Sequence, residues 1–147
     1  MIGLARGLCH PELPVSRSEL AGLCRRLLAA LDLEGRDFDL TVVGDAAMAR
    51  LNRDYLGLGG PTNVLSFPAD DPARPGYLGE MAVSGDTVAR EAFLYGQDPA
   101  GHLARLLAHG FLHLAGFDHG PLMDALTDAA VDALTDAAVD AVQSAKA

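Results

Sequence analysis

Three histidines between residues 109 and 119 are spaced as the ligands of a metal site would be. His109 and His113 lie within residues 104–115, where apolar residues recur with the period of a helix. Residues four apart on a helix share one face, with Cβ atoms about 6 Å apart, so both imidazoles can face one ion. Gly116 suits the left-handed position that ends a helix, and His119 follows three residues later as a third ligand. Three imidazoles that leave one position open for water are typical of catalytic zinc, and we predict one Zn²⁺ per chain.

Gly110 limits the chemistry that such a site can do. The pattern H-x-x-x-H-x-x-G-x-x-H is also that of the metzincin peptidases. In those enzymes a glutamate follows the first histidine and is the base that activates the metal-bound water. Gly110 has no side chain to accept a proton. A metallopeptidase would have to take its carboxylate from elsewhere in the chain, and Glu80 and Asp118 are the candidates.

Composition and charge set looser limits. The 147 residues suffice for one domain that buries about 70% of the surface of its unfolded chain. The apolar runs are shorter than the ~18 residues of a membrane span, and residues 1–14 lack the features of a secretion signal. We therefore expect a cytoplasmic location and no membrane partner. Cys9 and Cys24 are too far apart for a metal knuckle and are expected to be buried thiols.

The net charge of −9 does not by itself indicate a nucleic-acid partner, because phosphate contacts need lysine or arginine. The charge is uneven, however. Ten arginines precede Gly120, whereas the tail beyond it carries five aspartates and one lysine. A local groove can be basic on an acidic protein, so charge neither supports nor excludes RNA.

The pattern of expected strands and helices predicts an α+β fold. In this fold a small mixed β-sheet is covered by helices, and the metal site lies at the end of a long helix. Strands are expected at 38–43, 62–68 and 78–84, with a weaker one within 2–8. Helices are expected from Ser16 or Ser18 to 31, at 45–55, at 88–95 after Asp86 or Thr87 as cap, and at 104–115.

The tail contains an identical repeat, because residues 124–131 recur as 132–139. We divide the chain into a metal-dependent hydrolase domain, 1–120, and a helical extension, 121–147. Eight residues advance about 800° around a helix, so Leu126 and Leu134 lie about 80° apart and the apolar stripe drifts. We assign the tail no function.

Three blocks of the sequence resemble the YbeY endoribonucleases, bacterial zinc enzymes of ribosomal RNA maturation and ribosome quality control. The blocks are residues 51–68, with P-T-N-V-L-S-F-P at its end, residues 78–87, and residues 109–119. The resemblance implies that His109, His113 and His119 bind zinc, that single-stranded RNA is cut, and that ribosomal RNA and ribosomal subunits are the partners. It also makes Thr62, Asn63 and Ser66 candidates for contact with RNA.

One position departs from the pattern of these enzymes. They usually carry an arginine important for activity directly after the aromatic residue of the first block, and Leu56 stands there, followed by G-L-G-G. An aliphatic side chain cannot stabilise developing negative charge. Arg53, three residues earlier on the expected helix, is a candidate substitute.

The remaining roles have alternatives. Asp118 either orients a ligand histidine or is an ordinary turn aspartate. His102, seven residues before His109, is expected at the surface or behind the ligands rather than as a fourth ligand. Two other functions stay open, namely a metallopeptidase without the usual glutamate and a non-catalytic, zinc-stabilised ribosome-associated module, which Leu56 favours. The sequence gives no oligomeric state.

Overall fold

The computed structural model describes residues 1–5, 10, 13 and 16–146, with side chains up to residue 134. Strands and helices are mixed along the chain, as the α+β prediction requires. In order they are β1 (Ile2–Leu4), α1 (Arg17–Ala30), β2 (Asp37–Val43), α2 (Asp45–Leu56), β3 (Val64–Pro68), β4 (Tyr77–Ser84), α3 (Gly85–Leu94), α4 (Pro99–Leu114) and α5 (Pro121–Lys146).

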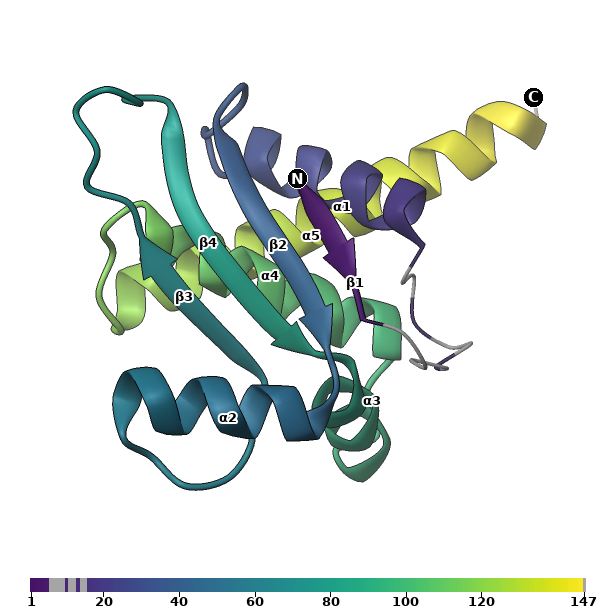
Figure 1. Ribbon diagram of the computed structural model, residues 1–147. Coiled ribbons are helices and arrows are strands. Elements are labelled where there is room, and N and C mark those ends of the chain that lie inside the picture. Colours follow the sequence, from purple (N-terminus) through teal and green to yellow (C-terminus); the bar gives the residue numbers. More distant parts are fainter. Residues whose placement is uncertain (6–9, 11–12, 14–15, 147) are drawn as a thin grey trace.

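The four strands form one mixed sheet in the order β1-β2-β4-β3, which confirms the predicted fold class (Figure 1). β1 and β2 pair in parallel, as do β2 and β4, with Leu40 opposite Met81. β3 runs antiparallel to β4 and forms an edge of the sheet. This edge strand is the part of the sheet that borders the metal site.

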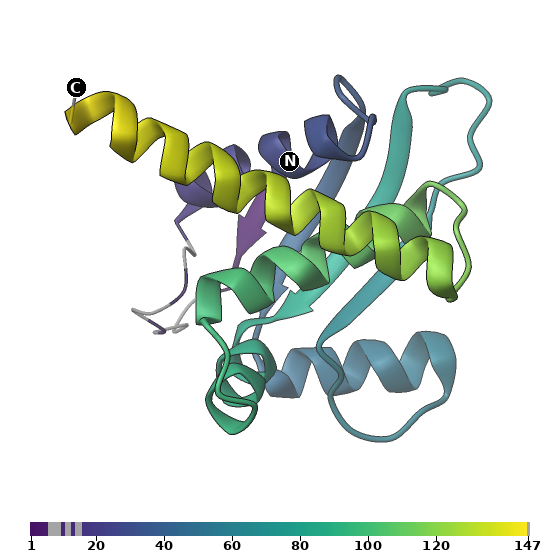
Figure 2. The same ribbon diagram turned by 180° about the vertical axis from the view of Figure 1, so that it is seen from behind.

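Most of the core lies between one face of the sheet and the helices α1, α4 and α5. Phe111 of α4 is fully buried there, and its ring meets that of Phe38 edge-on at 4.9 Å. Figure 2 shows α5 crossing over α4 on the side away from the sheet. Strand residues alternate between faces. In β4, Met81 belongs to this main core, whereas Ala82 belongs to a smaller cluster on the other face.

The smaller cluster packs under α2, which covers one end of the opposite face of the sheet (Figure 1). Met48 of α2 is fully buried against Val43, Leu65 and Ala82 of three different strands. The rest of that face is hollowed, and Glu80 and Asp39 are among the residues that line the hollow.

Two helix starts differ from the prediction. The histidine helix begins at Pro99 rather than at residue 104, because Asp98 caps it by accepting a hydrogen bond from the Gly101 N–H (2.9 Å). The predicted caps of α3 are wrong. Ser84 is the cap, and its Oγ accepts from the Thr87 N–H (3.2 Å).

Asp86, one of those predicted caps, serves a different helix. Its carboxylate accepts a hydrogen bond from the Asp45 N–H at the start of α2 (2.9 Å). At the N-terminus of α1 the prediction is confirmed, since Ser16 accepts from the Glu19 N–H.

The strand expected within 2–8 is formed at Ile2–Leu4, and residues 6–9, with Cys9, lie outside the described residues. Cys24 is buried, and burial raises the pKa of its thiol to about 12.

The first part of α5 belongs to the packed structure. Met123, Thr127 and Ala130 are buried, at 1%, 3% and 1% exposure, and Leu134 packs against the main core. These positions follow one another at intervals of three or four and so form one face of the helix. No helix in the described part of the chain combines the length and apolar character that crossing a bilayer requires.

Candidate metal centre

The C-terminal end of α4 brings the three histidines together. His109 and His113 lie one turn apart on this helix, and Gly116 ends it with φ at 98°, as predicted. The Gly116 N–H donates to the His113 carbonyl and the Phe117 N–H to the Leu112 carbonyl, both at 3.0 Å. This Schellman pattern reverses the chain within one turn. His119 therefore returns to the face that carries the first two histidines.

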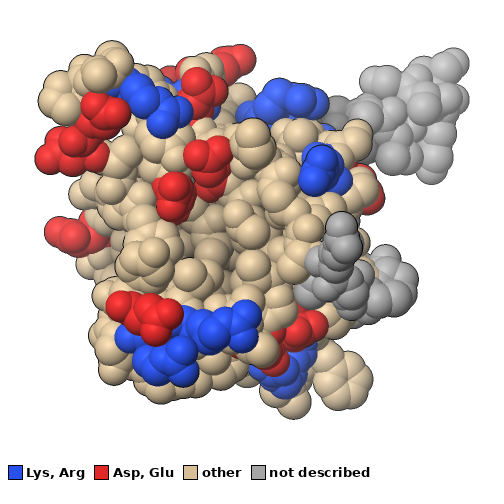
Figure 3. Space-filling view, in the orientation of Figure 1, with Lys and Arg blue, Asp and Glu red and all other residues tan. Residues whose placement is uncertain are grey.

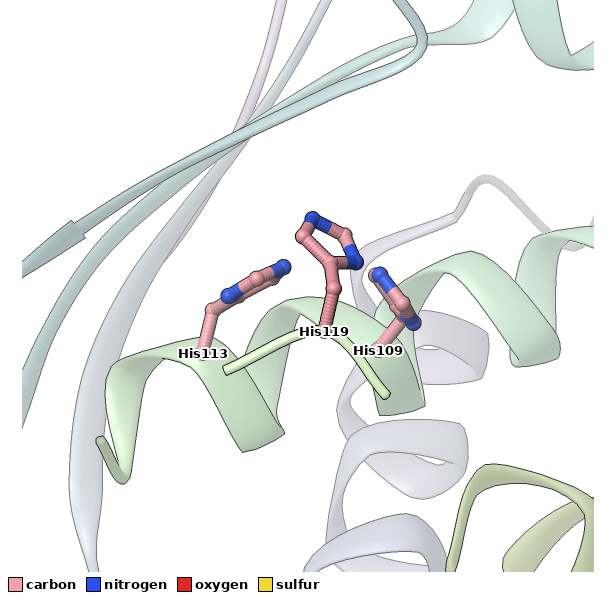
Figure 4. A group of neighbouring side chains, drawn as sticks. All are labelled: His109, His113 and His119. Carbon is pink, nitrogen blue, oxygen red and sulfur yellow. The ribbon is translucent and has the colours of Figure 1, made fainter. Parts of the chain in front are cut away.

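The three imidazole rings converge on one point (Figure 4). Ring centroids lie 4.9 Å apart for His109 and His113, 4.9 Å for His109 and His119, and 4.4 Å for His113 and His119. One nitrogen of each ring lies within 4.8 Å of the other two. Nitrogens that share a tetrahedral zinc ion are about 3.4 Å apart, so small ring rotations bring all three onto one ion. The donor set fits zinc.

Burial keeps two of these rings in the form that binds metal. Burial is the largest cause that lowers the pKa of His109, and the neighbouring His113 and His119 lower it further. The pKa of His113 is lowered by burial and by His119, against the opposing effects of a Phe117 backbone contact and the charge of Asp118. A lowered pKa favours neutral imidazole, which is the metal ligand.

The histidines open into a cleft of about 750 Å³ between α4 and β3. His119 is exposed while His109 and His113 are half-buried, so an ion held there would face the cleft. The loop before β3 and the turn after α4 form much of the wall. The predicted residues Thr62, Asn63, Ser66 and Asp118 all line this cleft.

Two of these residues are already held by protein contacts. The Asn63 side-chain oxygen accepts from the Val64 N–H (2.8 Å), and its amide donates to Glu91 Oε1 (3.1 Å). Ser66 Oγ donates to the Gly110 carbonyl (3.3 Å). These bonds fix both side chains at the wall of the cleft. Contact of Thr62, Asn63 or Ser66 with RNA stays a prediction.

Arg53 is not among the residues that line the cleft, whereas Leu56 is. The Arg53 side chain is 65% exposed on α2 and donates from Nε to Asp54 Oδ1 at 3.3 Å. Figure 3 shows basic and acidic atoms side by side over α2. Leu56 is 54% exposed at the end of the same helix and presents an apolar surface to the cleft.

Gly110 faces the sheet and not the metal site. A Cβ added to it would lie 2.1 Å from Met81 Sδ and 3.3 Å from Ser66 Oγ. Met81 would therefore have to move before a glutamate could be accommodated here. Glu80 does not replace it, because Glu80 lines the hollow on the other face of the sheet. Of the carboxylates considered for a peptidase, only Asp118 lines the metal cleft.

Two features of the site went unrecognised in the sequence. His102 is buried, at 8% exposure, which excludes the surface alternative and leaves the position behind the ligands, and its Nε2 lies 3.2 Å from Glu91 Oε1. Glu91 thus joins His102 to Asn63 at the cleft wall. The second feature is Arg105, which lines the cleft. Its position four residues before His109 was the available signal, since that spacing puts both on one helix face.

The fold and the site define a class, namely an α+β protein with three histidines that could hold a metal ion at an open cleft. A family model described as Endoribonuclease YbeY matches residues 12–134. The chain belongs to this family of endoribonucleases, which confirms the resemblance carried by the three sequence blocks. The match extends beyond those blocks at both ends and includes the first part of α5.

Individual relatives agree with this assignment. The Endoribonuclease YbeY of Oleidesulfovibrio alaskensis is 43% identical over 136 residues, which cover 78% of this chain and 80% of the relative. That of Nitratidesulfovibrio vulgaris is 41% identical over 138 residues, covering 81% and 85%. A Thermotoga maritima protein solved in solution has the same fold, with a TM-score of 0.61 at 23% identity, over 90% of this chain and 88% of that one.

Proposed function

We propose that this protein is a zinc-dependent endoribonuclease that cuts single-stranded RNA. Its partners are ribosomal RNA and ribosomal subunits, and it acts in the cytoplasm in ribosomal RNA maturation and ribosome quality control. The observation that carries the proposal is the convergence of three histidines in an open cleft, in a chain of the YbeY family. The finer parts, zinc, single strands and ribosomes, rest on the sequence resemblance and the donor set.

Zinc is the proposed ion because the donors are three imidazoles. Neutral ligands leave the full double charge of the ion to act on an anionic substrate. The chemistry that zinc would supply is activation of a water molecule and polarisation of a phosphoryl oxygen. His109, His113 and His119 hold the ion, and Asp118, whose charge acts on His113, orients the ligand set.

The cleft wall binds the substrate in this proposal. Thr62, Asn63 and Ser66 offer polar groups beside the metal centre, and the bonds of Asn63 and Ser66 to the protein hold them in place. Arg53 is proposed as a substitute for the arginine missing at position 56, since it lies one helical turn before Leu56. Leu56 itself is the observation that favours the rival function, a non-catalytic zinc-stabilised module on the ribosome.

The test compares three substrates with one preparation. Zinc-loaded protein should cut a labelled single-stranded RNA, leave the same RNA intact in a duplex, and leave casein intact. His113→Ala and chelator-treated protein should cut none of them. Casein digestion without RNA cleavage would establish the metallopeptidase. Ribosome binding without RNA cleavage, even in Leu56→Arg, would establish the non-catalytic module.

A further inference from the structure

Arg105 is a positive charge placed beside the metal centre. It lies on α4 four residues before His109, and therefore on the same face of that helix. Its side chain lines the cleft that the three histidines share. No other arginine among the described residues lines that cleft. Arg105 is therefore a second candidate, besides Arg53, for the positive charge that is missing at position 56.

The guanidinium is held by a residue of the acidic tail. Arg105 Nη1 donates to Asp128 Oδ1 of α5, and the two side chains are 44% and 59% exposed. An exposed pair of this kind contributes little to stability, so a competing anion can replace the carboxylate. A phosphate is such an anion, because the planar guanidinium can donate two parallel hydrogen bonds to it.

We propose that Arg105 binds a backbone phosphate of the RNA beside the metal centre, and that Asp128 occupies the guanidinium when RNA is absent. Asp128 then acts as an intramolecular competitor of the substrate. This inference rests on the proposed function, because it takes RNA as the ligand of the cleft. It also gives a role to the first copy of the tail repeat, in which Asp128 lies.

The packing of α5 allows the role of Asp128 to be tested without a loss of stability. Among the α5 residues up to 134, whose side chains the structure describes, Met123, Thr127 and Ala130 are buried, whereas the Asp128 side chain is 59% exposed. Neutral replacements at Arg105 and Asp128 should therefore leave the fold intact. Asp132 is a matched control, since it is an exposed aspartate one turn further along the same helix.

The experiment measures binding of a fluorescent single-stranded RNA to zinc-loaded, full-length protein by anisotropy over a range of salt concentrations. The RNA carries 2′-O-methyl groups and phosphorothioate linkages, and gels verify that it stays intact. Arg105→Gln should weaken binding about tenfold or more. It should also reduce the slope of log K against log salt by about 0.7, the value for one phosphate contact on a single strand. Arg25→Gln, an exposed arginine of α1, should leave both unchanged.

Asp128→Asn should strengthen binding by up to about fivefold, as release of an exposed pair allows. It should do so only while Arg105 is present, and Asp132→Asn should have a smaller effect. Equal effects of Asp128→Asn and Asp132→Asn, or an unchanged salt slope in Arg105→Gln, would overturn the inference. Cleavage of ordinary RNA by the wild type is scored separately. If the protein binds RNA through Arg105 but does not cut it, the proposed function alone is contradicted. If the protein cuts RNA but the salt slope of its binding is the same in Arg105→Gln, the inference alone is contradicted.

Discussion

Gly110 of α4 lies so close to Met81 of β4 that a Cβ on the glycine would fall 2.1 Å from the sulfur atom. The contact brings the helix backbone directly onto the sheet beside His109. The Gly110 carbonyl also accepts a hydrogen bond from Ser66 at the cleft wall. A side chain at this position would have to displace Met81, so the glycine affects the packing of the site as well as removing a possible base.

Replacement of Gly110 by alanine should lower the free energy of unfolding by about 1–3 kcal/mol through overpacking. The loss should appear although alanine favours helix by about 1 kcal/mol over glycine. Denaturant unfolding of Gly110→Ala, Met81→Ala and the double variant measures it, and the double variant should lose less than the two single losses combined. Gly22→Ala in α1 is the control. Its Cβ would meet only arginine side chains, the nearest atom at 3.6 Å, and it should stabilise. If Gly110→Ala were as stable as the wild type, the contact with Met81 would not limit the size of the side chain at position 110.

Restoring a cation at position 56 should strengthen RNA binding and cleavage. Leu56 is exposed and lines the cleft, so Leu56→Arg should bind single-stranded RNA about tenfold more tightly with little change in stability. Leu58→Arg is a matched control, because Leu58 is similarly exposed, at 57%, and does not line the cleft. Equal gains in the two variants would mean that net charge, and not position, is responsible.

The division of the chain at residue 120 stays a prediction that truncation can test. A chain that ends at Leu134 keeps the buried residues Met123, Thr127 and Ala130, and should melt within a few degrees of the full chain. A chain that ends at Gly120 loses them, and removal of a buried methionine side chain alone costs about 2–5 kcal/mol. We therefore expect it to melt far lower or not to fold. If it melted like the full chain, α5 would be a separate extension.

Stability should depend on pH through Asp45, which joins α2 to α3. Its carboxylate accepts hydrogen bonds from Arg90 Nη1 (2.9 Å), Thr87 Oγ1 (2.6 Å) and Ser84 Oγ (2.9 Å). The bond from Arg90 is the largest cause that lowers the pKa of Asp45, and it acts with those from Thr87 and Ser84 against the effect of burial. Because the folded pKa lies below the unfolded one, this stabilisation is complete above the unfolded pKa and is lost as the pH falls through the folded pKa.

Asp45→Asn should therefore be less stable than the wild type near pH 7, and should lose less stability on acidification. Thermal unfolding from about pH 7 to about pH 3 measures the difference. Asp70→Asn, an exposed aspartate of the loop before β4, is the control and should follow the wild-type profile. Parallel profiles for Asp45→Asn and the wild type would contradict the assignment.

The spacing of residues in the sequence predicted much of the site. Contacts between residues far apart in the sequence could not be predicted in this way. His109, His113 and Gly116 act within one helix end, so their spacing and the left-handed preference of glycine were enough. Arg105 and Asp128 lie 23 residues apart in different helices, and their pairing depends on how α5 packs against α4.

The same limit explains other differences. Asp86 caps a helix that starts 41 residues earlier, and Ser84 takes the cap that local sequence assigned to Asp86. The close approach of Gly110 to the sheet depends on Met81, a residue of another element, and on the order of strands in the sheet. The alternation of apolar and polar residues in strands, and their helical period in helices, indicated which elements exist. The contacts between these elements follow from the packing of the whole domain.

The most direct test of the account is the zinc content of purified protein after loading and dialysis, measured by mass spectrometry. The wild type should retain one zinc ion per chain, and His113→Ala should retain none. His102→Gln, on the same helix but outside the group of three, should retain the ion. A wild type that holds no zinc, or a His113→Ala variant that holds as much as the wild type, would contradict the assignment of the three histidines as metal ligands.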